Sequence, residues 1–162
     1  MLISVVTASD RCSKGLCEDK SGPLIAEILS PDADIAEYVI VPDEKELIAK
    51  ELIRLSDEVK SDIIFTTGGT GFAPRDVTPE ATKAVIEKDV PGIPEAIRAK
   101  SLEITPKAML SRACAGIRGR TLIINLPGSP KAVRESLETV MPVLEHAVET
   151  LSGNTQNCGG SY

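Results

Sequence analysis

Hydrophobic and polar positions along the first half of the chain fall into two alternating patterns. Nearly continuous apolar runs rich in β-branched residues occur at 2–9, 35–41 and 61–69. Such runs are typical of strands buried on both faces of a parallel sheet. Between them, apolar residues recur every three or four positions, at 23–30 and most clearly at 43–59, which predicts helices. This alternation predicts a parallel sheet with right-handed crossovers.

The second half predicts more helices and a return to the sheet. Three helical segments that open with a proline near the first turn cover 78–88, 91–103 and 106–113. Two short β-type runs around Gly119 predict a hairpin that rejoins the sheet, and a long helical pattern follows over 131–151. We therefore expect one α/β domain over residues 1–151. The small polar residues of 152–162 predict a flexible tail.

Composition narrows the possible functions. A chain of 162 residues can bury a full core, but it has no Trp, two Tyr and two Phe. Base-stacking platforms for single-stranded nucleic acid need exposed aromatic residues, and a net charge of −6 does not favour binding to a nucleic-acid backbone. No apolar run is long enough to cross a membrane, and the N-terminus has a strand pattern without signal-peptide features. We therefore expect a cytoplasmic protein without nucleic-acid or membrane partners.

The cysteines give a weak signal for metal. Cys12 and Cys17 form a C-x4-C pair, but the second half of a zinc site is missing, since the only histidine is His146. Cys114 and Cys158 stand alone. We expect all four thiols to be reduced and structurally incidental, as is usual in the cytosol.

The candidate chemistry starts at "TTGGTGFAPRD", residues 66–76, directly after a predicted strand. Ligands of open α/β sheets lie at the carboxyl ends of the strands. Glycines there let the backbone approach a ligand and orient several N–H groups one way, and a helix with Thr78 as its expected N-cap follows. This arrangement suits a phosphate. It is neither a Walker A loop nor G-x-G-x-x-G, so a purely structural turn stays an alternative.

Acidic residues at the same edge sharpen the hypothesis. Asp76 and Asp43 are each compatible with a helix-start role, in which the carboxylate caps or complements the helix dipole. The alternative is a carboxylate beside a phosphate, which a bound Mg²⁺ would make tolerable. Polar residues follow two further predicted strands, namely Ser9, Asp10 and Arg11 after the first, and Asn125, Gly128 and Ser129 after a late one. The residues alone therefore predict a site for a phosphorylated ligand with Mg²⁺.

Several stretches together resemble the Mog/MoaB-like molybdenum cofactor biosynthesis proteins over about residues 1–151. The similar segments are "SDR" at 9–11, "VPDE" at 41–44, "TTGGTGFAPRDVTPEAT" at 66–82 and "MLSRACAGIRGRTLIINLPGSPKAV" at 109–133. The resemblance implies a three-layer α/β/α fold with a mostly parallel central sheet and a homotrimer. It also implies Mg-ATP-dependent transfer of AMP to the terminal phosphate of molybdopterin, with release of pyrophosphate.

The resemblance also implies roles for individual residues. Asp43 and Asp76 match the family's acidic positions and are expected to be catalytic and to hold Mg²⁺. Nucleotide binding is expected at Ser9, Asp10 and Arg11. The expected substrate-binding residues are Thr67, Gly68, Gly69, Thr70, Gly71, Ser111, Arg112, Asn125, Pro127, Gly128 and Ser129. The expected partners are molybdopterin, ATP and the molybdenum insertase that acts downstream.

Two alternatives of different classes stay open at this stage. Some proteins of this fold superfamily bind the pterin without adenylylating it, and a related domain occurs in nucleotide-cleaving proteins of the competence-damage type. The presence of both Asp43 and Asp76 favours an enzyme over a binding module. Single-domain length and the "LSRACAGIRG" segment favour the transferase over a hydrolase.

Overall fold

The computed structural model describes residues 1–153, which build around a single six-stranded sheet. The strand order is β2-β1-β3-β6-β5-β4. The four parallel strands are β1 (Leu2–Ala8), β2 (Asp34–Val41), β3 (Ile63–Thr67) and β6 (Thr121–Leu126). The antiparallel strands are β5 (Ala115–Arg118), which pairs with β6, and β4 (Lys88–Asp89), which pairs with β5. The predicted parallel sheet and returning hairpin are thus confirmed.

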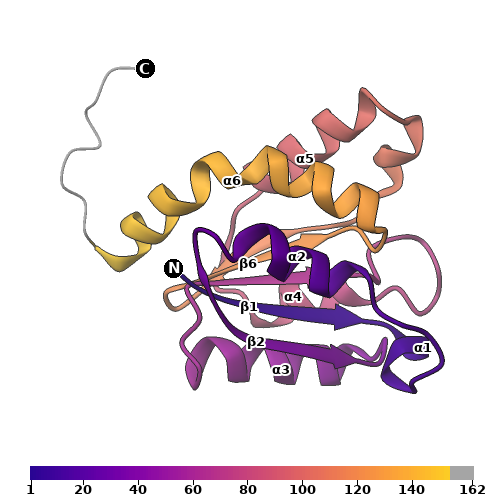
Figure 1. The fold of residues 1–162 in the computed structure, drawn as a ribbon, viewed down its shortest axis with the longest axis horizontal. Helices are drawn as coiled ribbons and strands as arrows, with labels where there is room; N and C mark the ends of the chain where they lie inside the picture. The colour runs from indigo at the N-terminus through magenta and orange to yellow at the C-terminus, as the bar shows by residue number, and fades with distance from the viewer. Residues whose placement is uncertain (154–162) are drawn as a thin grey trace.

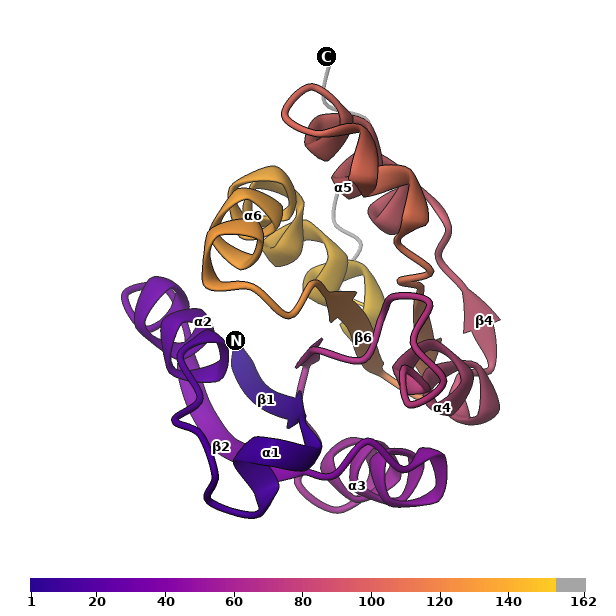
Figure 2. The same ribbon diagram turned by 90° about the vertical axis from the view of Figure 1, so that its right-hand side faces the viewer.

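Helices cover both faces of this sheet, giving three layers (Figures 1 and 2). One layer holds α2 (Ser21–Leu29), α5 (Gly92–Leu102) and α6 (Pro130–Ser152), and the other holds α3 (Lys45–Asp57) and α4 (Thr78–Val85). Successive side chains of a strand point to opposite faces, so Val5 packs with the first layer and Val6 with the second. This double burial explains why β1 and β3 are continuous apolar runs.

Three local predictions differ from the structure. The polar loop after β1 contains a short helix, α1 (Asp10–Ser13), and the helix expected over 106–113 is a 3-10 turn, η1 (Pro106–Leu110). The helix expected over 78–88 ends at Val85. Glu87 donates its backbone N–H to the carbonyl of Ile117 at 2.7 Å, so pairing with the sheet replaces the last helical turn.

The cysteine prediction was wrong for one pair. Cys12 and Cys17 form a disulfide that closes the loop after β1, which also removes them as metal ligands. Cys114 is a free thiol, as expected, and burial raises its pKa to about 11. Cys158 and the predicted tail from residue 154 on lie outside the described residues. No helix of the described chain combines the length and apolar character that a membrane span requires.

Candidate functional site

The carboxyl ends of β1, β2, β3 and β6 lie along one edge of the sheet, as their parallel pairing requires. In the sheet, β2 lies on one side of β1 and β3 lies on the other. The carboxyl ends of β1 and β3 therefore form a topological switch point. Ser9 donates its backbone N–H to the carbonyl of Val41 at 2.9 Å, which joins the loops after β1 and β2. On the other side, a Cβ added to Gly128 would lie 3.3 Å from the Cα of Gly68. The polar loops expected from the sequence are thus in mutual contact.

The glycine-rich loop (residues 68–76) starts at this switch point. Gly68 and Gly69 have φ angles of 92° and 64°, which residues other than glycine rarely adopt. A Cβ on Gly68 would lie 2.4 Å from the carbonyl oxygen of Ala8, so only glycine fits between β3 and β1. Within residues 1–153, the backbone N–H groups of Gly69, Thr70 and Gly71 donate no hydrogen bond. They form a set of donors that is open to an anion.

Asp10 and Asp43 lie together beside this loop. The backbone N–H of Asp10 donates to Oδ2 of Asp43 at 2.8 Å, and the N–H of Asp43 donates to Oδ1 of Asp10 at 3.1 Å. Arg75, from the glycine-rich loop, donates to both carboxylate oxygens of Asp10 at 2.9 and 2.8 Å, and this contact holds the pKa of Asp10 below its usual value. The N-cap of α3 is Glu44. Asp43 therefore joins two loops and does not cap the helix that follows it.

The carboxylates carry more negative charge than the site neutralises. Burial raises the pKa of Asp43, and the negative charges of Asp10 and Asp76 add to this rise, while the hydrogen bond from the backbone of Asp10 and the charge of Arg75 oppose it. Asp76 accepts a hydrogen bond from the N–H of Ala73 at 2.9 Å and does not cap α4, whose N-cap position is Val77. Neither aspartate therefore caps the helix that follows it, although both lie near a helix start. A divalent cation would relieve this excess charge.

The residues present fit a divalent cation such as Mg²⁺ that prefers oxygen ligands. Mg²⁺ is commonly held by one or two carboxylates together with water and substrate phosphates. Asp43 and Asp76 supply that number beside the open N–H groups of residues 69–71. No group of three or more His, Cys, Asp or Glu side chains suited to a metal is found in the described part of the chain.

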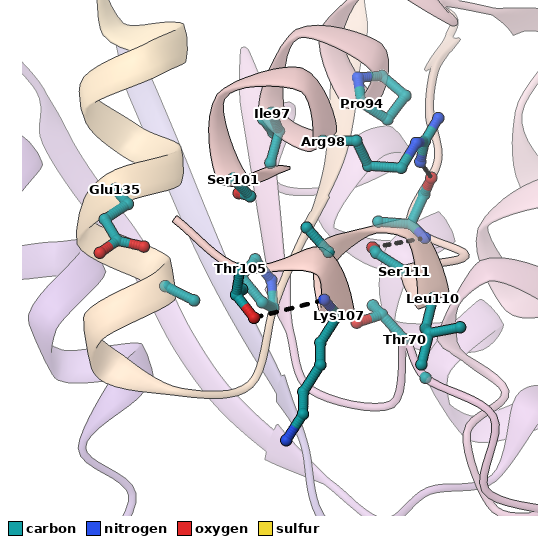
Figure 3. A pocket seen from close by; sticks show the side chains of 15 residues that line it. Thr70, Pro94, Ile97, Arg98, Ser101, Thr105, Lys107, Leu110, Ser111 and Glu135 are labelled. Atoms are coloured by element: carbon teal, nitrogen blue, oxygen red, sulfur yellow. Dashed lines mark hydrogen bonds between the residues drawn. The ribbon is translucent and has the colours of Figure 1, made fainter. Parts of the chain in front are cut away.

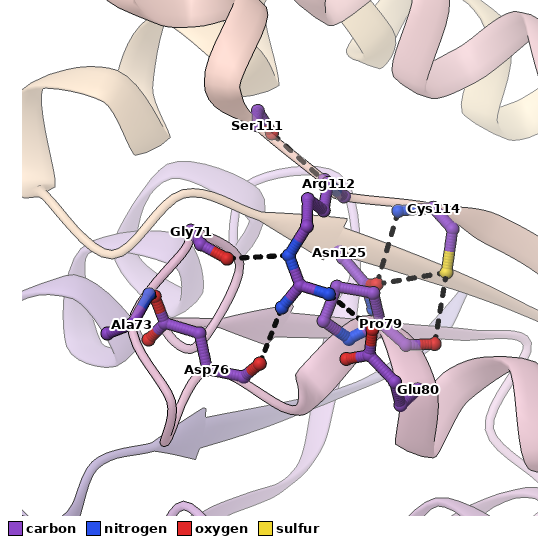
Figure 4. A network of polar contacts seen from close by, with 10 residues as sticks. Gly71, Ala73, Asp76, Pro79, Glu80, Ser111, Arg112, Cys114 and Asn125 are labelled. Carbon is purple, nitrogen blue, oxygen red and sulfur yellow. Dashed lines mark hydrogen bonds and ion pairs between the residues drawn. The ribbon is translucent and has the colours of Figure 1, made fainter.

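Arg112 fixes the other side of the glycine-rich loop (Figure 4). Its guanidinium donates to the carbonyl of Gly71 at 2.6 Å, to the carbonyl of Asp76 and to the carboxylate of Glu80. Its backbone N–H donates to the carbonyl of Thr70 at 2.9 Å. We call these four contacts the Arg112 clamp. Arg112 lies at the site as expected, but its donors are used by the protein itself.

Asn125 lies beneath the site and not in it. Its side chain is fully buried, and its amide donates to Thr66 at 2.9 Å and to Thr82 at 2.8 Å. Its carbonyl oxygen accepts from the N–H of Cys114 at 3.3 Å. These contacts join β6, β3, α4 and the segment before β5. The geometry gives Asn125 an internal linking role in place of the expected contact with substrate.

Three other expected residues have structural contacts of their own. Thr67 is buried and donates to the carbonyl of Pro127 at 2.7 Å, which joins the loops after β3 and β6. Ser129 is the N-cap of α6 and accepts from the N–H of Ala132. Ser9 caps α1 in the same way. Arg11, in contrast, is exposed and has no ion-pair partner in the described residues.

A mostly apolar cavity of about 290 Å³ opens beside the glycine-rich loop (Figure 3). Four expected residues line it, namely Thr70, Gly71, Ser111 and Pro127. Ile97 of α5, Leu110 of η1 and Ala132 of α6 complete its apolar wall. A second, more polar pocket of about 630 Å³ shares Arg98 and Ser111 with the first. An apolar cavity with a few polar groups next to open N–H donors suits a flat ring system that carries a phosphate.

Asp19 is a site-supporting residue that the sequence interpretation missed. It accepts from the hydroxyls of Thr7 and Tyr38, both at 2.6 Å, and from the N–H groups of Ser21 and Gly22. Burial alone would raise its pKa, but these hydrogen bonds outweigh that effect and leave the pKa lowered. Asp19 thereby anchors the loop between β1 and α2. The pattern Asp-x-Ser before a helix is a local capping signal that could have pointed to it.

Fold and site together define an α/β protein with a glycine-rich loop and neighbouring carboxylates at a topological switch point. The chain belongs to the family described as "Probable molybdopterin binding domain", whose model matches residues 4–146. It is 52% identical over 155 residues to the molybdopterin adenylyltransferase of Helicobacter pylori strain J99, covering 94% of this chain and 88% of that protein. It is 44% identical to the molybdopterin adenylyltransferase of Escherichia coli K12, covering 85% and 72% respectively. The crystal structure of the molybdopterin biosynthesis enzyme MoaB from Thermus thermophilus matches with a TM-score of 0.89 and 48% identity, covering 94% and 96%.

Proposed function

We propose that this protein is a molybdopterin adenylyltransferase. In this reaction the terminal phosphate of molybdopterin attacks the α-phosphate of ATP, so that a new P–O bond forms and pyrophosphate leaves. The names of the similar proteins from Helicobacter pylori and Escherichia coli support this assignment. The observation that carries it is that both Asp43 and Asp76 lie against the glycine-rich loop: a Cβ added to Gly69 would lie 3.2 Å from Oδ1 of Asp43, and one added to Gly71 would lie 2.8 Å from Oδ2 of Asp76. A module that only binds a pterin has no need for such a concentration of negative charge.

The two phosphate-bearing substrates are proposed to meet at the glycine-rich loop. The N–H groups of Gly69, Thr70 and Gly71 would donate to phosphate oxygens, because they donate to no protein acceptor in the described residues. The apolar cavity beside Thr70 and Ser111 would receive the pterin ring system. Exposed Arg11 would contact the triphosphate of ATP, while Ser9 and Asp10 hold the loop that presents it.

Asp43 and Asp76 would hold the Mg²⁺. When bound, the ion would offset the repulsion between the anionic phosphates and stabilise the charge that develops in the transition state. The backbone N–H of Asp10 already fixes Oδ2 of Asp43, so Oδ1 is the oxygen left for the cation. The guanidinium of Arg75 neutralises Asp10, which keeps that third carboxylate from competing.

The proposal extends to the protein's assembly and place in the cell. Family resemblance supports a homotrimer, a cytoplasmic location and delivery of the adenylylated product to a molybdenum insertase. The exposed apolar side chains of Leu102, Ile104, Met109 and Leu110 near η1 offer a surface for contact between copies.

The test is pyrophosphate release from ATP, Mg²⁺ and molybdopterin by wild type and by the Asp43→Asn and Asp76→Asn variants. Asparagine keeps the size but removes the charge, so we expect each change to lower turnover by on the order of 10²-fold, or ~2.7 kcal/mol. Molybdopterin affinity should fall much less. Asp32→Asn, at an exposed turn, is the matched control and should keep full activity.

Three outcomes would contradict the proposal. Near-normal turnover by Asp76→Asn would remove the argument from the carboxylates. Tight molybdopterin binding by wild type without pyrophosphate release would identify a binding module. ATP cleavage that does not depend on molybdopterin would identify a hydrolase.

A further inference from the structure

One hydroxyl group near the carboxylates lacks a partner. Thr78, the first residue of α4, is fully buried, and its Oγ1 makes no hydrogen bond within the described residues. A buried hydroxyl without a partner loses its hydrogen bonds to water and receives nothing in return, so such a group needs a specific explanation. The sequence interpretation expected Thr78 to be the N-cap of α4, but that position belongs to Val77, and no side chain caps the helix.

The hydroxyl of Thr78 points to the same small space as Asp43. A Cβ added to Gly69 would lie 2.4 Å from Oγ1 of Thr78 and 3.2 Å from Oδ1 of Asp43. The backbone N–H of Thr78 donates to the carbonyl of Gly69 at 3.1 Å, which fixes the start of α4 against the glycine-rich loop. Because Asp10 uses Oδ2 of Asp43, Oδ1 is the free oxygen that shares this space.

Local structure does not explain why the side chain is a threonine. The hydroxyl neither caps α4 nor donates back to a carbonyl of the preceding turn, which are the two usual uses at such positions. Valine has nearly the same shape and would fill the space beside Gly69 without burying an unpaired polar atom. The chemistry that a hydroxyl adds over valine is a hydrogen bond aimed towards Asp43.

We propose that Thr78 is a positioning residue for the divalent cation of this site. Its hydroxyl, which faces the space that Oδ1 of Asp43 also lines, would donate to that oxygen and hold it in the orientation that binds the metal. This inference rests on the part of the proposed function that assigns Asp43 as a cation ligand. Partners of this kind, which contact a metal through its ligands, typically change metal affinity about 10- to 100-fold when they are removed.

The experiment measures Mn²⁺ binding to the full chain by electron paramagnetic resonance of the free ion, without ATP or pterin. We expect Thr78→Val to weaken Mn²⁺ binding about tenfold. Thr78→Ser keeps the hydroxyl and should bind Mn²⁺ like wild type. Without metal, Thr78→Val should melt at the same temperature as wild type or higher, because an unpaired buried hydroxyl is removed.

Thr82→Val is the matched control on the same helix. Thr82 is also fully buried, but its hydroxyl accepts from Asn125, so this variant should melt at a lower temperature and bind Mn²⁺ normally. Unchanged Mn²⁺ affinity in folded Thr78→Val would overturn the inference, as would the absence of Mn²⁺ binding by wild type at millimolar concentration. A wild-type protein that binds Mn²⁺ but releases no pyrophosphate would instead refute the proposed function and leave the role of Thr78 standing.

Discussion

Replacing Arg112 with lysine or methionine removes the planar guanidinium group, whose hydrogen bonds hold the glycine-rich loop against the segment before β5. The guanidinium makes three contacts in this loop region, with the carbonyls of Gly71 and Asp76 and the carboxylate of Glu80. Lysine has one ammonium group without a planar fork and can keep at most part of this arrangement. Methionine fills a similar volume and keeps none of it. The two variants therefore remove the three side-chain contacts of the Arg112 clamp in two steps and leave its backbone contact with Thr70 in place.

The magnitude follows from the number of contacts and their exposure. Hydrogen bonds that involve a charged group contribute about 1.5–3 kcal/mol each, but the Arg112 side chain is 32% exposed, so solvent screens part of this. We expect a loss of about 2 kcal/mol for Arg112→Lys and about 3 kcal/mol for Arg112→Met. For a chain of this size, 1 kcal/mol shifts the melting temperature by roughly 2–4 °C, which gives a drop of about 4–8 °C for the lysine variant.

The assay pairs thermal unfolding with pyrophosphate release and molybdopterin binding, all at one protein concentration because oligomers melt in a concentration-dependent way. Since the clamp holds the carbonyl of Asp76, turnover should fall together with stability. Arg118→Lys is the control. The guanidinium of Arg118 donates to Asp57 and to the carbonyl of Val85 near the β5–β6 turn. Loss of these hydrogen bonds should lower the melting temperature and leave turnover unchanged.

The competing interpretation is the one that the sequence favoured, in which Arg112 contacts the substrate directly. It predicts the opposite pattern. If Arg112→Lys melts like wild type but binds molybdopterin much more weakly, the guanidinium reaches the ligand and the clamp is not its main role.

Gly69→Ala places a side chain at a positive φ and against Oγ1 of Thr78, so it should destabilise the protein by about 2–4 kcal/mol in a thermal or urea unfolding experiment, and a wild-type melting curve would contradict the geometry. Asp19 has a lowered pKa, so its hydrogen bonds stabilise the fold above the unfolded-state pKa of about 3.9 and are lost as the pH falls through the folded-state value. Asp19→Asn should therefore melt lower near neutral pH and lose less stability than wild type between about pH 5 and pH 2; parallel curves would exclude this role. The chain should form a homotrimer of three 17.2 kDa copies, and a monomer mass from light scattering at micromolar concentration would refute this.

The amino-acid sequence by itself determined the architecture and the location of the site. Apolar runs at 2–9, 35–41 and 61–69 predicted β1, β2 and β3 within two residues at each end. The runs of β1 and β3 reflect burial on both faces in the centre of the sheet, whereas β2 is an edge strand whose residues are only partly buried or exposed. Parallel strands end at one edge, which placed Asp43 and Asp76 together before any contact was known. These features could be predicted because periodicity records burial, and burial depends on local spacing along the chain.

Only the tertiary structure decided which partner each polar side chain has. Arg75 pairs with Asp10 across 65 residues of sequence, and Arg112 reaches Gly71 across 41. The sequence predicted that Arg112 binds the substrate, and nothing in its spacing shows that its guanidinium donates to carbonyl groups of the protein instead. Asn125 was predicted to lie just after a strand, but it lies within β6, where its amide donates to Thr66 of β3. Such contacts depend on strand order and loop packing, which bring distant groups within hydrogen-bond reach and leave no periodic pattern in the sequence.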